Sequence, residues 1–172
     1  MQTEPKLTPT SYAVLGLVAL WGPCTPYDLK GALEMSVANF WPVPHTTFYV
    51  EPEKLEKAGL LSVDQEEHGR RRKLYSVTDA GREALRAWVG EPVAAPPQLR
   101  DEMMVKIFLG ADLAPLAEAR LAFHREKAAE LEGYLKATRE AGDMPGVERS
   151  LIAGLAYEDA MQKMITRLRR AS

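Results

Sequence analysis

The sequence predicts a mainly α-helical protein with one small β-hairpin, built in two parts. Residues 40–77 read as a helix that ends at Gly59, followed by two alternating apolar strands around a basic turn. Residues 90–98, GEPVAAPPQ, contain three prolines and one glycine, which is typical of a stiff linker. Three amphipathic helical patterns fill the rest of the chain. We therefore expect an N-terminal domain at 1–92, a linker at 93–98 and a helical domain at 99–172.

The composition is that of an ordinary folded protein without a bulk positive charge. The chain has 172 residues, of which 46% are hydrophobic and 27% are charged, and its formal net charge is −2. Such a chain does not coat nucleic acid indiscriminately, so any binding to DNA must rest on a local basic patch. The four consecutive cations from Arg70 to Lys73 form the clearest patch of this kind.

The sequence favours a reducing, aqueous compartment. Cys24 is the only cysteine, which excludes an intramolecular disulfide or a zinc site built from cysteines, and we expect it to be a buried, inert thiol. The longest apolar run, Tyr12 to Trp21, is about half the length that crosses a bilayer. No secretion signal is recognisable at the N-terminus. We expect a cytoplasmic protein.

Two helices are expected before residue 40. Thr8 or Thr10 can cap the first, which is apolar almost all round and ends at Gly22-Pro23. We expect that helix to be deeply covered. Thr25-Pro26 supplies the cap and the first-position proline of the second helix. Its inward residues would be Leu29, Leu33 and Val37.

A third helix is expected at about 45–58, after the proline-rich turn at 41–44. Phe48, Leu55 and Ala58 lie on one side of it, and Gly59 stands where a left-handed C-cap residue belongs.

Pro52 interrupts this third helical pattern. A proline inside a helix removes the hydrogen bond to the carbonyl four residues back, here Phe48, and costs about 3 kcal/mol. We therefore expect a kink, or a short turn at 45–50 and a fresh helix with Pro52 near its first turn.

A β-hairpin and a fourth helix follow. The two strands would contain Leu60, Leu61 and Val63, and then Leu74, Tyr75 and Val77, around a polar tip at 68–72 in which Gly69 supplies the turn. Thr78-Asp79 then caps a helix with an inner stripe of Ala84, Leu85, Trp88 and Val89. Helices followed by a hairpin with a cationic tip are the parts of a winged helix-turn-helix. In that fold one helix can enter a major groove while the hairpin straddles neighbouring phosphates.

The C-terminal part predicts three helices. The first spans 99–109, with Leu99, Met103, Ile107 and Phe108 inward and Gly110 at its end. The second spans about 114–141 and carries Leu116, Phe123, Leu131 and Leu135. The third spans about 147–170, with Val147, Leu151, Gly154, Glu158, Met161, Ile165 and Leu168 at heptad-like spacing.

Two residues in the last stripe leave alternatives open. Gly154 either permits a close approach of another helix or is a tolerated surface glycine, and Glu158 is either a paired interface charge or a sign that the register is wrong. Because two long amphipathic helices make a poor closed monomer, we expect them to bury their stripes against a second copy in a twofold dimer.

The motifs around the hairpin resemble one family. Two motifs resemble those of the PadR family of bacterial transcriptional regulators. The first is Tyr49, then five residues, Leu55-Glu56, two residues and Gly59-Leu60-Leu61; the second is GRRRKLYSVTDAGR at 69–82. Phe40-Trp41-Pro42 resembles the members with a long helical C-terminal domain. The resemblance implies a DNA-binding regulator, usually a repressor, that in many members responds to a small hydrophobic or phenolic ligand.

From this motif we predict contacts to double-stranded DNA. The third helix is expected to contact bases and phosphates through His45, Thr46, Thr47, Tyr49 and Lys54. The hairpin tip is expected to contact phosphates or the minor groove through Arg70, Arg71, Arg72 and Lys73. The alternatives are capping for the two threonines, a half-buried scaffold role for Tyr49 and a solvated tip for the basic run. In a dimer the two reading helices must lie about 34 Å apart, which predicts an inverted-repeat operator.

Aromatic and sulfur-bearing side chains could line an effector pocket: Trp88, Met103, Met104, Phe108, Met161 and Met164. The alternative is core packing, because methionines at helical spacing are more often filler.

Enzymatic activity and protein interaction are the two alternatives to DNA binding. His45, His68 and His124 lack paired ligand spacing, and no phosphate loop or nucleophile elbow is present, so we expect neither an enzyme nor a cofactor or metal site. The stronger rival is a winged helix kept for protein interaction. Pro52 stands where the family usually has an aliphatic residue, and Glu51, Glu53 and Glu56 add negative charge to the same helix.

Overall fold

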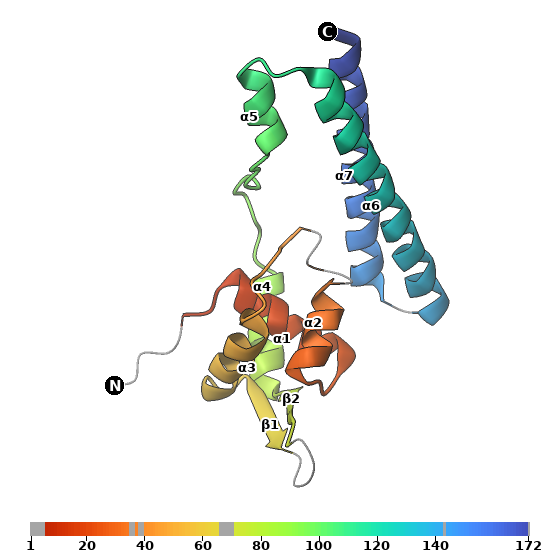
Figure 1. Cartoon of the computed structure of the whole chain (residues 1–172). Coiled ribbons are helices and arrows are strands. Elements are labelled where there is room, and N and C mark those ends of the chain that lie inside the picture. The colour runs from red at the N-terminus through yellow and green to blue at the C-terminus, as the bar shows by residue number, and fades with distance from the viewer. Residues whose placement is uncertain (1–5, 35–36, 38–39, 66–70, 143, 172) are drawn as a thin grey trace. The chain divides into compact units, whose positions relative to one another are not determined.

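The structure is a computed structural model that describes residues 6–34, 37, 40–65, 71–142 and 144–171. Its internal contacts divide the chain into two compact units, residues 1–94 and 95–172 (Figure 1). The first unit contains α1 Pro9–Trp21, α2 Pro26–Glu34, α3 Thr47–Lys57, β1 Leu61–Gln65, β2 Lys73–Val77 and α4 Asp79–Val89. The second contains α5 Glu102–Phe108, α6 Leu113–Ala141 and α7 Pro145–Ala171. The predicted fold class, mainly helical with one small hairpin, is confirmed.

Helix α1 forms the centre of the first unit. Thr8, one of the two predicted caps, makes a capping box with Ser11, in which each side chain accepts from the other's backbone N–H. As predicted, the helix is covered on most sides, with Val14, Leu15 and Val18 fully buried. It packs against α2, α3, α4 and β2. The hydroxyl of Thr10 instead accepts a hydrogen bond from the Trp41 indole over 3.0 Å.

Helix α2 begins as predicted at Thr25-Pro26. The backbone N–H of Asp28 donates to the Thr25 hydroxyl over 3.3 Å, and the backbone N–H of Thr25 donates to the Asp28 carboxylate over 2.9 Å. These bonds from Thr25 hold the pKa of the Asp28 carboxyl below its ordinary value. Leu29 and Leu33 enter the core, so the predicted inner stripe is confirmed there.

Helix α3 runs without a break through Pro52. It starts at Thr47 and ends at Lys57, so the expectation of a fresh helix beginning near Pro52 is wrong. The proline removes only one backbone hydrogen bond from the helix. Its ring is fully buried and lies on the inner face of α3 together with Phe48 and Leu55. Burial of this face against α1, α2 and β1 outweighs the local cost. Gly59 follows the helix with φ +73°, the left-handed value expected of its C-cap position.

The hairpin is antiparallel, with Leu61 paired to Val77 and Gln65 to Lys73. Of its predicted tip at 68–72, the residues His68, Gly69 and Arg70 lie outside the described residues. Strand β2 is also tied to the turn between α1 and α2, because Cys24 and Tyr75 exchange backbone hydrogen bonds of 3.1 and 3.0 Å. Cys24 is buried as predicted, and this burial raises the pKa of its thiol to about 11.

Helix α4 closes the first unit. The Thr78 hydroxyl caps it by accepting from Gly81 N over 3.0 Å, and it donates to the carbonyl of Gly59 over 2.8 Å. Gly81 is required here, since a Cβ atom on it would lie 2.2 Å from the Leu60 carbonyl oxygen. Trp88 stacks on Tyr12 with ring centroids 4.7 Å apart. Val89 was predicted on the inner stripe, but it is 69% exposed because the helix ends there, past the last turn that faces α1.

Helix α5 is shorter than the predicted 99–109. Asp101 caps it through Met103 N at 2.9 Å, so the residues before Asp101, Leu99 included, are extended and exposed. Met103 is buried and Ile107 partly buried, as predicted, whereas Phe108, predicted inward, is 86% exposed. Phe108 follows Ile107 by about 100° around the helix, and α5 buries a narrow stripe against α6 and α7.

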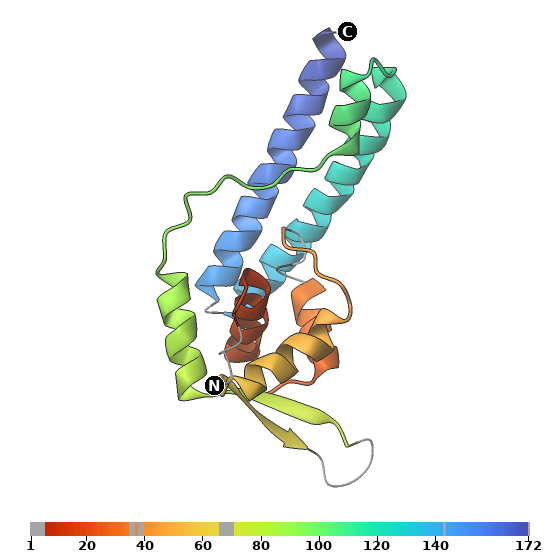
Figure 2. The same ribbon diagram turned by 90° about the vertical axis from the view of Figure 1, so that its left-hand side faces the viewer.

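Helices α6 and α7 form an antiparallel pair (Figures 1 and 2). Leu131, Leu151 and Ile165 are buried in it, and a Cβ on Gly154 would come within 3.2 Å of Leu131 Cδ1. Gly154 therefore supports the predicted close helix approach. Phe123 was predicted inward but is exposed, because Leu121 and His124 occupy the buried side of this turn.

Candidate nucleic-acid interface

One side of α3 is exposed and carries polar and aromatic side chains. Phe48, Pro52 and Leu55 face the core, which leaves the opposite side of the helix to solvent. Tyr49, Glu53 and Lys57 follow one another at four-residue spacing on that side, and Val50 lies beside them. A helix of this width with one free face has the dimensions needed to enter a major groove of DNA.

The exposed face of α3 borders a groove shared with two other elements of the first unit. The groove has a volume of about 370 Å³, and its lining comes from the start of α2, from α3 and from β2 with the residue before it: Thr25, Pro26, Tyr27, Tyr49, Glu53, Arg72, Lys73 and Tyr75. Tyr27 is 80% exposed. Aromatic hydroxyls, two cations and one carboxylate thus surround a single surface depression.

An ion pair crosses this groove. Lys73 Nζ donates to Glu53 Oε1 over 2.6 Å, and both side chains are about half exposed. The hydrogen bond from Lys73 holds the pKa of the Glu53 carboxyl below its ordinary value, and the same bond raises the pKa of Lys73. Both groups are therefore charged at neutral pH. The ion pair connects the helix to the hairpin.

The predicted residues around the start of α3 lie at the edge of this face. The His45 side chain is exposed, with its ring centroid 5.8 Å from that of Tyr49. Thr46 precedes the helix but makes no side-chain capping bond, and its side chain is exposed. Thr47 is the first helical residue. These three residues and Tyr49 are thus brought together at the N-terminal end of the helix.

Lys54 has intramolecular partners instead. Its ammonium donates to the hydroxyl of the buried Ser11 over 3.2 Å and lies 3.6 Å from Glu51 Oε1. The other oxygen of Glu51 is buried without a hydrogen-bond partner among the described residues. Lys54 thus joins α3 to α1, and it also lines a surface hollow together with Val50, Glu53 and Lys57.

The basic hairpin is described from Arg71 onward, and the predicted contact Arg70 lies outside the described residues. Arg71 and Arg72 are exposed, and Arg71 has φ +48°, a left-handed value that turns the chain into β2. The carbonyl of Arg71 accepts from the Gln65 side chain over 3.3 Å. Of these two arginines, Arg72 lines the groove.

Seven residues that line this surface were not predicted as contacts, and Glu53 among them was noted only as a negative charge: Thr25, Pro26, Tyr27, Val50, Glu53, Lys57 and Tyr75. The spacing of Glu53 and Lys57 from Tyr49 could have found them, because i, i+4 and i+8 share one face of a helix. Tyr27 gave no such signal, since it comes from another helix and reaches the groove only through packing.

The predicted effector residues are not gathered at one place. Trp88 belongs to the first unit, where it stacks on Tyr12. In the second unit, Met103 and Met164 belong to a buried cluster with Ile165, and Met161 is also buried. Met104 and Phe108 are exposed. A hollow of about 430 Å³ between α5 and α6 includes Met103 of the predicted set, together with Phe123, Lys106 and Arg120.

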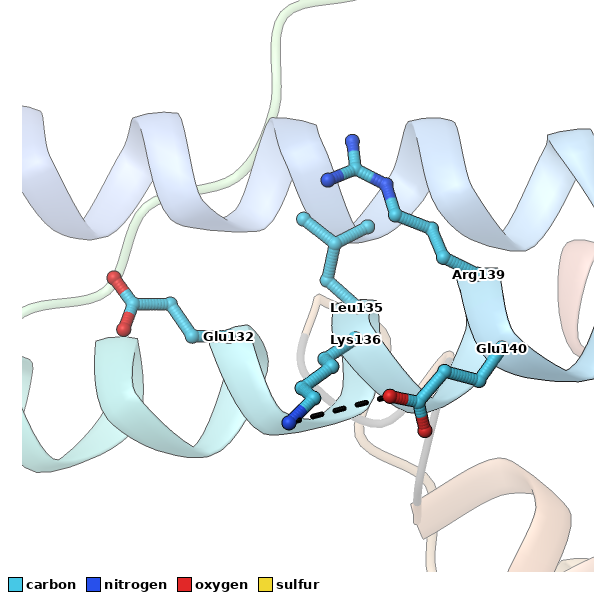
Figure 3. A pocket seen from close by; sticks show the side chains of 5 residues that line it. All are labelled: Glu132, Leu135, Lys136, Arg139 and Glu140. Atoms are coloured by element: carbon cyan, nitrogen blue, oxygen red, sulfur yellow. Dashed lines mark ion pairs between the residues drawn. The ribbon is translucent and has the colours of Figure 1, made fainter.

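A second hollow in this unit, of about 440 Å³, does not resemble a ligand cavity. Its lining side chains all belong to α6, and Lys136 and Glu140 among them form an ion pair of 4.0 Å (Figure 3). A depression along the outside of one helix cannot surround a small molecule.

Among the residues that the structure describes, no group of three or more His, Cys, Asp or Glu side chains could hold a metal ion. None of the helices described is long and apolar enough to span a membrane.

The first unit is a winged helix-turn-helix domain, and the exposed face of its helix α3 is mixed aromatic and charged. Residues 14–87 match the Transcriptional regulator PadR-like family. The match is confined to the winged-helix domain, and the family that it names is one of transcriptional regulators.

Several known proteins are similar to this chain. The Negative transcriptional regulator PadR of Bacillus subtilis is 29% identical over 99 residues, which is 56% of this chain and 54% of that protein. The chain thus spans about half the length of this curated relative. The structure of Bacillus subtilis PadR in complex with operator DNA matches 97% of this chain and 99% of its own, with a TM-score of 0.83 and 21% identity. The complex of the same protein with p-coumaric acid matches 92% and 94%, with a TM-score of 0.73 and 24% identity. These likenesses show the fold.

Proposed function

We propose that this chain is a sequence-specific DNA-binding transcriptional regulator. The observation that carries the proposal is the single groove in which Tyr49 and Glu53 of α3 meet Arg72 and Lys73 of the hairpin. A reading helix and a cationic hairpin on one surface can contact base edges and phosphates of the same duplex. The fold match to PadR bound to operator DNA supports the same conclusion.

In this proposal α3 enters the major groove with its exposed face. His45, Thr46, Thr47 and Tyr49 contact bases and phosphates near the start of the helix. Arg70, Arg71, Arg72 and Lys73 of the hairpin bind neighbouring phosphates or reach the minor groove, and Lys54 is a further contact if it leaves Ser11.

The regulator acts as a homodimer on an inverted repeat. Several large apolar side chains of the second unit are exposed, and a second copy would cover them: Val105, Phe108, Leu109, Phe123, Ile152 and Tyr157. The linker at 93–98 would let two reading heads take the separation of about 34 Å between successive major grooves. Because the curated relative is named a negative regulator, we propose repression.

A small hydrophobic or phenolic effector is part of the proposal. Bacillus subtilis PadR has been crystallised with p-coumaric acid. Here the hollow between α5 and α6 offers the apolar Met103 and Phe123 next to the cations Lys106 and Arg120. Those cations are already paired, Lys106 with Glu102 at 2.7 Å and Arg120 with Asp101, so an anionic effector would have to compete with carboxylates of the chain.

One observation favours the rival function, a winged helix that binds protein. The cations of the reading region are in part neutralised, since Lys54 lies near Glu51 and Lys73 is bonded to Glu53. A phosphate must displace or share these partners, which lowers the electrostatic gain from DNA binding.

Selection of bound duplexes from a random pool, followed by salt titration, tests the two functions. A dimeric sequence reader enriches an inverted repeat with half-sites about one helical turn apart. Arg71→Ala/Arg72→Ala should then weaken binding strongly and flatten its salt dependence, whereas the matched control Arg169→Ala/Arg170→Ala, which removes two exposed cations of α7, should not. Weak retention without enrichment, equal in both double variants, contradicts DNA reading and favours the protein-binding alternative.

A further inference from the structure

Glu53 is an acidic residue in the middle of a surface that should attract a polyanion. It lies on the exposed face of α3, one turn after Tyr49 and one turn before Lys57, and it lines the groove with Arg72 and Lys73. Near the phosphates of DNA a carboxylate is repelled. Because Glu53 lies in the centre of the proposed reading face, this repulsion must be offset by a favourable contact that only some DNA sequences supply.

A purely structural role does not account for Glu53. Its contact with Lys73 is a half-exposed ion pair, and such pairs contribute little to stability because water screens them. Helix α3 is held instead by the burial of Phe48, Pro52 and Leu55. The fold does not need a carboxylate at this position.

The bond to Lys73 has a consequence for orientation. Lys73 donates to Oε1, and a carboxylate can accept about four hydrogen bonds, so acceptor capacity remains on the exposed side. The partner also keeps the carboxyl group ionised, because the pKa of Glu53 is lowered by this bond. The ionised Glu53 carboxylate can therefore accept further hydrogen bonds but donate none, and Lys73 of the hairpin holds its side chain in place.

The chemistry of the major groove restricts what such a group can bind. Cytosine presents a single donor there, N4–H₂, while guanine presents the acceptors N7 and O6 and thymine the acceptor O4. Adenine offers a donor next to the acceptor N7, which repels a second negative group. Among the four bases, cytosine is the one whose edge gives a carboxylate a donor and no adjacent acceptor on the same base.

We propose that Glu53 is a specificity-determining residue, which accepts a hydrogen bond from the exocyclic amino group of a cytosine while Lys73 positions its carboxylate. The inference rests on the proposed DNA-binding function and deepens it. It predicts one cytosine in each half-site, at the base pair that lies against the middle of α3.

The test compares Glu53→Gln with the matched control Glu56→Gln in duplex selections with the full chain. Both changes remove one negative charge from α3, but Glu56 is partly buried and does not line the groove, whereas Glu53 does. Affinities are compared among sequences within each variant, so a general gain from the lost charge cancels. Thermal melting of both variants checks that they are folded.

The wild-type protein should prefer cytosine at one position of each half-site by at least about fivefold. Glutamine binds adenine through N6 and N7, so Glu53→Gln should move the preference at that position from cytosine to adenine and leave the other positions unchanged. Glu56→Gln should keep the wild-type preference.

The inference is overturned if Glu53→Gln keeps the wild-type base preference and, like Glu56→Gln, changes the affinity for every sequence by the same factor. That result leaves the proposed function intact. Absence of any enriched sequence for the wild-type protein overturns both.

Discussion

His124 of α6 and Glu158 of α7 form a hydrogen-bonded pair inside the second unit, through Nδ1 and Oε2, with both side chains less than a tenth exposed. The pair resolves the alternatives left by the sequence for Glu158, which is a paired charge between helices of one chain. His124 Nε2 is buried without a partner among the described residues, so the pair is only partly satisfied.

Removal of one member of this pair should be destabilising. Glu158→Ala leaves the His124 ring buried without its acceptor, and breaking a buried pair costs about 3–5 kcal/mol. Urea unfolding followed by circular dichroism measures the change. The double variant His124→Leu/Glu158→Leu should recover most of the loss, since an apolar pair needs no hydrogen bond. If the single and double variants are equally unstable, the pair is not the cause.

Gly81→Ala should destabilise the first unit by at least about 1–3 kcal/mol, the usual cost of overpacking. The new methyl group would lie 2.2 Å from the Leu60 carbonyl, which belongs to the backbone and cannot turn aside. Gly31→Ala is the matched control, because Gly31 is inside α2 and has no atom within 4 Å of the added position. The control should be stabilising by up to about 1 kcal/mol. Thermal melting compares the two, and an equal effect contradicts the close approach.

The Cys24 thiol should resist alkylation in the native protein and react rapidly in urea. Burial raises the pKa of the thiol to about 11, so the reactive thiolate is scarce at neutral pH and the group is covered. Mass spectrometry after timed iodoacetamide treatment measures the rates. Rapid labelling of the folded protein would show that the thiol is accessible.

The same pKa shift predicts a loss of stability at alkaline pH. The folded protein holds the Cys24 proton up to about pH 11, whereas the unfolded chain releases it near the ordinary value of 9.0. The folded state is therefore disfavoured progressively as pH rises above about 9. The difference in unfolding free energy between Cys24→Ala and the wild type should grow in favour of the variant from pH 8 to 10.5. A pH-independent difference contradicts the shift.

Lys57 should contribute more to DNA binding than Lys54. Lys57 is exposed on the face of Tyr49 and Glu53, while Lys54 is held by Ser11 and lies near Glu51. If Lys57 contacts a phosphate, Lys57→Ala should weaken binding to all sequences and lower the salt slope by about one. Lys54→Ala should have a smaller effect on the slope. Fluorescence anisotropy across a salt series tests the order, and the reverse order would contradict the assignment of the exposed face.

Much of the fold follows from local signals in the sequence. Thr8, Thr25 and Thr78 cap helices where their hydroxyls were expected to do so, and Gly59 takes the left-handed conformation at the end of α3. Capping and turn formation involve atoms only a few residues apart, so the sequence contains all the participants. Winged-helix architecture and family resemblance follow from the order of these elements.

The errors occur where distant residues decide. The expectation was a kink, or a fresh helix with Pro52 near its first turn, but burial of the Pro52 face against α1, α2 and β1 sustains one helix from Thr47 to Lys57. Phe108 and Phe123 were expected inward, yet their neighbours Ile107 and His124 take the sides that face other helices. The hydrophobic pattern of a helix locates its apolar stripe to within about one residue. The helix that packs against it determines which of the neighbouring residues are buried.

Neighbouring residues are sufficient to specify the order of helices and hairpin, the helix caps and the basic hairpin, because backbone capping and hydrophobic periodicity are local properties of the chain. Packing of distant elements is needed for Lys54 to bind Ser11, for Glu158 to meet His124, and for Glu53 and Lys73 to share one groove. Each of these pairs joins side chains twenty or more positions apart, and only packing of separate elements brings such groups within hydrogen-bonding distance.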